Sequence, residues 1–199
     1  MKKPFILITN DDGIKAKGLK ELYSAINDIA DVFIIAPNKV RSGAGHSVSI
    51  WQNIEIKKTK FYKKLAYSVK GTPVDCIKIA MFNLLRKKPL LVISGINHGP
   101  NIGRDIMYSG TAAAAREAGF NGIKSIALSM NAWRPKFMFE VAKEFLDKHL
   151  EKLINLDYKN YFLNINFPNI SKNDVKGTKI TKPCINHYFQ DEIIHFDSP

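Results

Sequence analysis

Several apolar runs in this chain lack any alternation with polar residues, and they constrain the fold more than any other feature of the sequence. The segments 5–9 (FILIT), 31–37 (DVFIIAP) and 90–95 (LLVISG) are apolar at nearly every position. Strands have this composition when helices cover both faces of a parallel sheet. Because helical periodicity follows the first run, over residues 19–30, we predict right-handed βαβ units and a doubly wound, mostly parallel α/β sheet.

A helix start is well signalled at Thr72. Thr72 can cap the helix, Pro73 suits its first turn, and Asp75 stands where a capping box needs an acceptor. We also predict helices over residues 110–119 and from about Pro135, and strands over residues 125–130 and 161–168. Even spacing of apolar residues from Val48 to Ile56 predicts a half-exposed strand.

The length of 199 residues suggests one domain with an appendage, and we place the domain at residues 1–170 and a C-terminal extension at residues 171–199. No apolar run reaches the ~20 residues of a membrane span, and the N-terminus does not resemble a signal peptide, so we expect a cytoplasmic protein without membrane association. The net charge of +12 is spread along the chain, as on a solvated surface. No RNA-binding motif or zinc finger accompanies it, so nucleic acid is not expected as a specific partner.

Two adjacent carboxylates, Asp11 and Asp12, follow the first predicted strand directly. Ligands of open α/β sheets bind beyond the carboxyl ends of the strands, where the loops bearing Ser42 and Asn97 also emerge. Carboxylate, hydroxyl and amide oxygens suit a hard divalent cation, which would relieve the repulsion between the two acids. The alternative is that one Asp caps the next helix and the other is solvated.

A second group of polar residues, Ser109, Gly110 and Thr111, stands directly before the small-residue helix predicted at residue 110 onward. Free N–H groups at a helix N-terminus, together with two hydroxyls, can bind a phosphate group. Simple capping of the helix by Ser109 or Thr111 is an equally good interpretation.

The segments ILITNDDG, APNKVRSGAGHS, GTPVDC, VISGINHGPNIG and YSGTAAAAREAG occur in that order, and LNINFPN follows them. Together they resemble the SurE survival protein family of 5'/3'-nucleotidases. The resemblance implies a Rossmann-like domain, a homodimer or dimer of dimers, and one divalent metal ion per subunit, with Mg²⁺, Mn²⁺ and Co²⁺ as candidates. It also implies hydrolysis of phosphate from nucleoside monophosphates, and from short polyphosphate in some members.

Carried over by motif, the resemblance assigns Asp11, Asp12 and Asn97 to catalysis, and these three with Ser42 to the metal. The expected phosphate- or substrate-binding residues are Gly43, His46, Asn101, Ser109, Gly110 and Thr111.

Two other functions compete with this interpretation. A non-catalytic, basic nucleotide- or RNA-binding module on the same scaffold would bind in a salt-sensitive way without turnover. An aspartyl-phosphate phosphatase would need two Asp residues spaced Asp-x-Asp, whereas Asp11 and Asp12 are adjacent.

The C-terminal segment departs from the family pattern. Family chains usually continue to a terminal strand with a GYVSITPL-like ending, whereas this sequence stops at Pro199 after HFDSP. A truncated or shortened tail affects the predictions of the oligomer and of the outer wall of the pocket. It does not affect the prediction of the metal-binding loops.

We predict a homodimer in which residues after about Lys176 contact the second copy. The tail carries apolar residues that so short a segment cannot bury by itself, so it either folds back on its own sheet or reaches a second copy. The resemblance to the SurE family, whose members are dimers with exchanged C-terminal segments, favours the second copy. Light scattering should show a dimer for the full chain and a weakened dimer after a cut behind Asn173. A full-length monomer at high concentration, or an equally stable dimer after the cut, would contradict this prediction.

Overall fold

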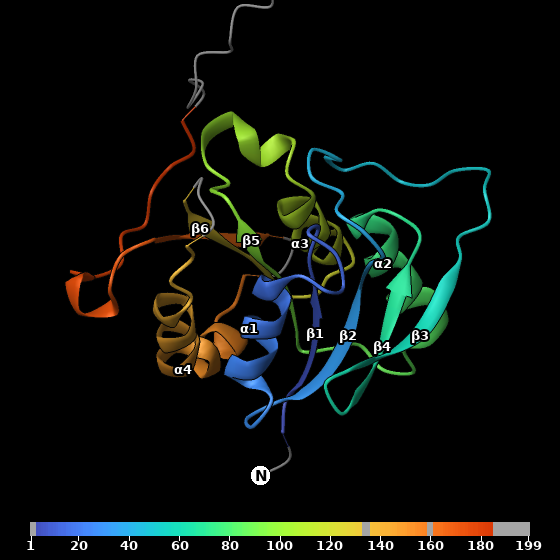
Figure 1. The fold of residues 1–199 in the computed structure, drawn as a ribbon, viewed down its shortest axis with the longest axis horizontal. Helices are drawn as coiled ribbons and strands as arrows, with labels where there is room; N and C mark the ends of the chain where they lie inside the picture. The colour runs from blue at the N-terminus through green and yellow to red at the C-terminus, as the bar shows by residue number, and fades with distance from the viewer. Residues whose placement is uncertain (1–2, 133–135, 159–160, 185–199) are drawn as a thin grey trace, which may run out of the picture.

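The protein forms a seven-stranded sheet with helices on both faces, in a computed structural model that describes residues 3–132, 136–158 and 161–184 (Figure 1). The strand order is β3-β4-β2-β1-β5-β6-β7, and every neighbouring pair except β3–β4 is parallel. The strands are β1 (Phe5–Thr9), β2 (Asp31–Pro37), β3 (Ile56–Phe61), β4 (Lys64–Val69), β5 (Leu91–His98), β6 (Ser125–Asn131) and β7 (Phe162–Pro168). The helices are α1 (Lys17–Ile26), α2 (Pro73–Ile79), α3 (Gly110–Phe120) and α4 (Glu140–Asn155), and short helical turns η1 (Ala80–Leu84), η2 (Gly103–Met107) and η3 (Lys172–Asp174) complete the set.

Both faces of the sheet are buried, which explains the continuous apolar runs. Within β1, Ile6 and Ile8 join the core under α1 and α4, whereas Leu7 joins the core under α2 and α3. All three side chains are fully buried. Figure 1 shows α1 and α4 in front of the sheet, with α2 and α3 behind it. The predicted doubly wound fold is therefore confirmed.

The predicted capping box at the start of α2 is present, with Thr72 and Asp75 bonded reciprocally. The strand predicted between Val48 and Ile56 is wrong, because residues 48–55 form a loop and β3 begins only at Ile56. The helix expected from about residue 135 begins at Glu140. Position 135 itself lies outside the described residues.

The point where the strand order reverses lies at β1. The chain places β2 and β4 on one side of β1, then crosses to β5, β6 and β7 on the other side. The loops that follow β1 and β5 therefore diverge at one edge of the sheet, which is where α/β proteins bind ligands.

The C-terminal segment leaves the sheet after β7, as expected. Residues 176–184 are exposed, Ile180 among them. The other apolar tail residues on which the predicted dimer depends, from Ile185 onward, lie outside the described residues. Among the described helices, none combines the length and apolar character that crossing a membrane requires.

Helix α1 approaches β5 more closely than a side chain would allow. The register of β5 against β6 shifts between Ser94 and Asn97. At this irregularity the carbonyl oxygen of Ile96 lies 1.9 Å from where a Cβ on Gly18 would stand. Only glycine fits at position 18, because the obstacle is backbone.

We predict that Gly18→Ala lowers the free energy of unfolding by about 1–3 kcal/mol, the usual effect of overpacking. In an unobstructed helix the same change would stabilise by up to ~1 kcal/mol. Urea unfolding measures the effect, with the exposed Ser24→Ala in α1 as the matched control. A neutral or stabilising Gly18→Ala would refute the close approach of α1 to β5.

Candidate functional site

Asp11 lies at the end of β1 and is buried against the first turn of α3, with 3% of its surface exposed. The Thr111 hydroxyl donates a hydrogen bond of 2.5 Å to Asp11 Oδ1. A Cβ at Gly110 would lie 2.8 Å from the Cβ of Asp11 and 3.0 Å from Pro73 Cγ. The helix can reach the carboxylate because position 110 has no side chain.

Asp12 turns toward the end of β5. Its Oδ2 accepts a hydrogen bond of 3.2 Å from the His98 backbone N–H, and His98 Nδ1 lies 3.7 Å from the same oxygen. The side-chain Nδ2 of the neighbouring Asn97 donates a hydrogen bond to Gly99 O at 3.0 Å. The Oδ1 atom of the same amide takes no part in that bond. Because β1 and β5 are adjacent parallel strands, the two acids and Asn97 lie at the same edge of the sheet.

Within the described residues, the ion pairs give the two carboxylates a single basic neighbour, His98 beside Asp12. Burial raises the pKa of Asp11 from 3.8 to about 6, although the Thr111 hydroxyl opposes the rise. Burial also raises the pKa of Asp12, against the influence of His98. Among the described residues no Lys or Arg forms an ion pair with either acid. A cation at this edge would supply the missing charge.

The residues present fit a hard divalent cation. In the described part of the chain, no three His, Cys, Asp or Glu side chains are grouped as metal ligands. The carboxylates of Asp11 and Asp12 would therefore be completed by neutral oxygens such as the Asn97 amide, and by water. Mg²⁺ and Mn²⁺ accept this ligand set.

The loop of residues 38–55 carries Ser42 and Gly43, both exposed. Its start is fixed to the site, because the Arg41 N–H donates to the Asp11 carbonyl oxygen at 2.7 Å. Ser42 is therefore adjacent to a residue bonded to Asp11. Contact between the Ser42 hydroxyl and a metal stays a prediction.

The far part of the same loop is tied to the start of α2. The Thr72 hydroxyl donates to Ser47 O at 2.8 Å, and Asp75 accepts from the Ser49 N–H and hydroxyl at 2.9 and 2.7 Å. The residues of the predicted capping box, Thr72 and Asp75, thus stabilise both the start of α2 and the loop of residues 38–55.

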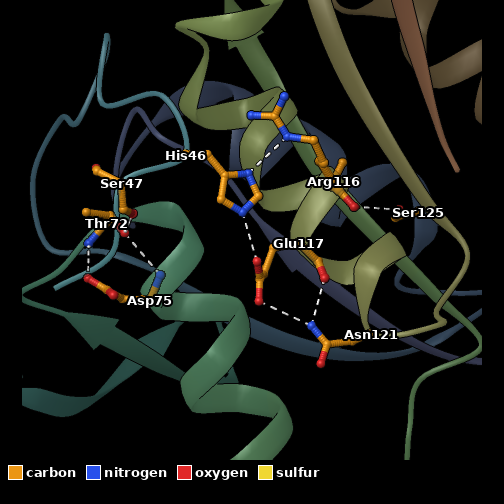
Figure 2. A network of polar contacts seen from close by, with 9 residues as sticks. His46, Ser47, Thr72, Asp75, Arg116, Glu117, Asn121 and Ser125 are labelled. Atoms are coloured by element: carbon orange, nitrogen blue, oxygen red, sulfur yellow. Dashed lines mark hydrogen bonds and ion pairs between the residues drawn. The ribbon is translucent and has the colours of Figure 1, made fainter. Parts of the chain in front are cut away.

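His46 bonds to α3, as Figure 2 shows. Arg116 Nε donates to His46 Nδ1 at 3.0 Å, and His46 Nε2 lies 2.8 Å from Glu117 Oε2. Arg116 can only donate and the ionised carboxylate can only accept, so these partners select the neutral tautomer protonated at Nε2. His46 therefore anchors the loop to α3, and its expected contact with substrate stays a prediction.

Asn101 is held by a polar network that sequence reasoning missed. Its carbonyl oxygen accepts from Asn164 Nδ2 at 2.7 Å and from Asn166 Nδ2 at 3.0 Å, and its own Nδ2 donates to Ser129 Oγ at 2.8 Å. The alternating asparagines of the LNINFPN segment were the available signal, because polar side chains that a strand half-buries at every second position need hydrogen-bond partners.

Ser109 caps α3, with its hydroxyl oxygen accepting from the Ala112 N–H at 3.0 Å. The capping interpretation is thus confirmed for Ser109 but not for Thr111, whose hydroxyl bonds to Asp11. The capping bond uses an acceptor site of Ser109 and leaves its O–H able to donate.

Comparison with known proteins decides the family. The profile of the family described as Survival protein SurE matches residues 6–190. The chain belongs to the SurE family. All the candidate site residues lie within the matched range.

Individual SurE relatives agree with this assignment. A protein named 5'-nucleotidase SurE from Flavobacterium johnsoniae is 41% identical over 95% of this chain and 74% of its own length. One of the same name from Syntrophomonas wolfei is 42% identical over 92% of this chain and 70% of its own length. The crystal structure of the SurE protein from Aquifex aeolicus superposes with a TM-score of 0.82 at 38% identity, covering 91% of this chain and 73% of that one.

We predict that Asp11→Asn stabilises the metal-free protein at neutral pH. The folded-state pKa of about 6 exceeds the ordinary value of 3.8, so stability is lost as pH rises through this interval. At pH 7.5 the loss amounts to about 3 kcal/mol, at 1.36 kcal/mol per pKa unit. Urea unfolding in EDTA should show a stability gain for the variant that shrinks between pH 7.5 and pH 4.5. A variant less stable than the parent at pH 7.5 would contradict the buried, uncompensated carboxylate.

We also predict that Glu117→Ala loosens the loop of residues 38–55. Losing a hydrogen bond to a charged group costs about 1.5–3 kcal/mol, so the open loop should become roughly ten- to hundred-fold more populated. Limited trypsin digestion measures this at Lys39 and Arg41, with the exposed Asp147→Ala as control. Equal cleavage rates in the two variants would show that the His46 contact does not hold the loop.

Proposed function

We propose that this SurE-family chain is a metal-dependent nucleotidase that hydrolyses the phosphate monoester of nucleoside monophosphates, with short polyphosphate as a further substrate. The observation that carries the proposal is the buried Asp11 carboxylate, held by Thr111 beside Asp12 at the edge where the strand order reverses. The names of its relatives, 5'-nucleotidase SurE, support the reaction class.

Asp11, Asp12, Ser42 and Asn97 would hold one divalent ion per subunit, with Mg²⁺ and Mn²⁺ as first candidates and Co²⁺ as the third. When bound, such an ion polarises the phosphate and lowers the pKa of a coordinated water. This chain's carboxylates supply the negative charge that retains the ion in a buried place.

Asp11 is our candidate for the group that orients the attacking water and accepts its proton, and Asp12 is the second candidate. Thr111 fixes the Asp11 carboxylate through its hydroxyl, which restricts the direction in which that carboxylate can accept. Burial raises the pKa of Asp11 in the metal-free chain, and a bound divalent cation would lower it again, so the role assigned to Asp11 rests on its position at the site.

The first turn of α3 would receive the phosphate group. The N–H groups at a helix N-terminus carry partial positive charge and would stabilise the negative charge that the transferred phosphoryl group gains. Gly43, Asn101, Ser109 and Gly110 would complete the pocket. The network from β6 and β7 fixes the backbone at Asn101, so this wall is preorganised.

We further propose that the chain works in the cytoplasm as a homodimer, with residues 1–170 as the catalytic domain and residues 171–199 as the segment that contacts the second copy. The alternative of a non-catalytic binding module is less well supported, because the relatives of this chain bear the names of enzymes.

Phosphate release tests the proposal, with 5'- and 3'-nucleoside monophosphates and tripolyphosphate assayed under each metal. We expect activity that EDTA abolishes and that Asp11→Asn reduces by at least a hundred-fold, while the exposed Asp28→Asn retains it. Thr111→Val should reduce activity roughly ten- to hundred-fold. Full activity in EDTA would contradict the proposed metal dependence. Salt-sensitive nucleotide binding without phosphate release would favour the non-catalytic binding module.

A further inference from the structure

A pocket of about 310 Å³ is lined by residues of α1, of the segment before it and of the β3–β4 hairpin, and neither Asp11 nor Asp12 belongs to its lining. Two of its lining residues, Ile14 and Lys15, directly follow the Asp11-Asp12-Gly13 turn in the sequence. The volume is at the lower end of the range for small-molecule sites. Three lysines line this pocket, Lys15, Lys20 and Lys60, and we call it the lysine pocket.

The charges of the lysine pocket are not compensated. Two lysines of the same hairpin have acidic partners, since Lys57 pairs with Glu55 at 2.8 Å and Lys64 pairs with Asp31 at 3.1 Å. Lys58 and Lys63 of this hairpin form no ion pair within the described residues, and neither do the three lining lysines. The lining lysines differ in that all three border one hollow, which no acidic side chain lines. Cations that come from two separate segments and share one hollow repel each other unless an anion lies between them.

Aromatic rings form the remainder of the lysine pocket. Phe61 is 5% exposed and supplies an apolar wall, whereas Tyr62 is 63% exposed. Tyr62 adopts a φ of 53°, which is uncommon for a residue other than glycine, and its ring stacks on Tyr23 of α1 at 5.8 Å. The ring is therefore held at the rim with much of its surface open to solvent.

We propose that the lysine pocket binds an oligophosphate group, a chain of two or more phosphates. Three ammonium groups match several negative charges better than one carboxylate or one phosphate. The group can belong to a nucleoside triphosphate, whose base would stack on Tyr62, or to inorganic polyphosphate. The inference concerns binding at a site separate from the catalytic acids, and it does not require turnover there.

The test must separate this pocket from general attraction, because a chain of net charge +12 draws any polyanion. Calorimetric titration with tripolyphosphate at 150 mM salt in EDTA compares two charge-matched triple variants, both in an Asp11→Asn background that prevents turnover. One carries Lys15→Gln, Lys20→Gln and Lys60→Gln. The other carries Lys58→Gln, Lys63→Gln and Lys152→Gln, at exposed lysines that do not line the pocket.

We expect the pocket variant to lose at least ten-fold in affinity and the control variant less than three-fold. An equal loss in both would show non-specific attraction and overturn the proposal, as would a parent without measurable binding at millimolar tripolyphosphate. The single variants Lys20→Gln and Lys60→Gln serve if the triple variant unfolds, and unchanged affinity in both would also overturn it. Since binding is measured directly, a chain that lacks nucleotidase activity can still pass or fail this test.

Titration with ATP distinguishes the two sources of the oligophosphate. Tighter binding of ATP than of tripolyphosphate, lost in Tyr62→Ala, supports a nucleotide as the occupant. Equal affinities that Tyr62→Ala leaves unchanged support an inorganic chain.

Discussion

The hydrogen bond from Thr111 to Asp11 joins the two halves of the sheet at the place where their paths diverge. Asp11 lies two residues after β1, whereas Thr111 lies in the first turn of α3, the helix that leads to β6. The bond forms because Gly110 lets the helix come close enough that any side chain would collide with Asp11. Around this contact, the ends of β1, β2 and β5 supply the remaining groups of the site.

The fold was largely predictable because the two faces of a parallel sheet impose a simple composition on its central strands. Ile6, Leu7 and Ile8 show this rule, since neighbours pack into opposite cores. The rule fails at the edge. β3 lies at the edge of the sheet, where it pairs with β4 alone, and its residues are mostly exposed. Because it is rich in lysine, its sequence resembles a solvated loop. The antiparallel pairing with β4 stabilises it as a strand. The even spacing of Val48 and Ile50 was misleading because both side chains are exposed in a loop.

The candidate site was predictable where residues directly follow strands and much less where it depends on distant pairs. The adjacency of Asp11 and Asp12, and the position of Thr111 at a helix start, are local facts of sequence. His46, by contrast, bonds to residues 70 and 71 positions away, and Asn101 to side chains 63 and 65 positions away. No local pattern encodes such pairs. Only the path of the chain through the sheet brings them together.

The support of Asn101 by the last strand has a consequence for the order in which the protein becomes active during synthesis. Domains fold as units while the chain emerges from its N-terminus. Asp11 and Asp12 are made among the first residues, yet the wall at Asn101 acquires its partners only when Asn164 and Asn166 have been added. A nascent chain that already contains the acidic pair thus still lacks the side chains that fix Asn101, and these arrive only with β7, the last strand among the described residues.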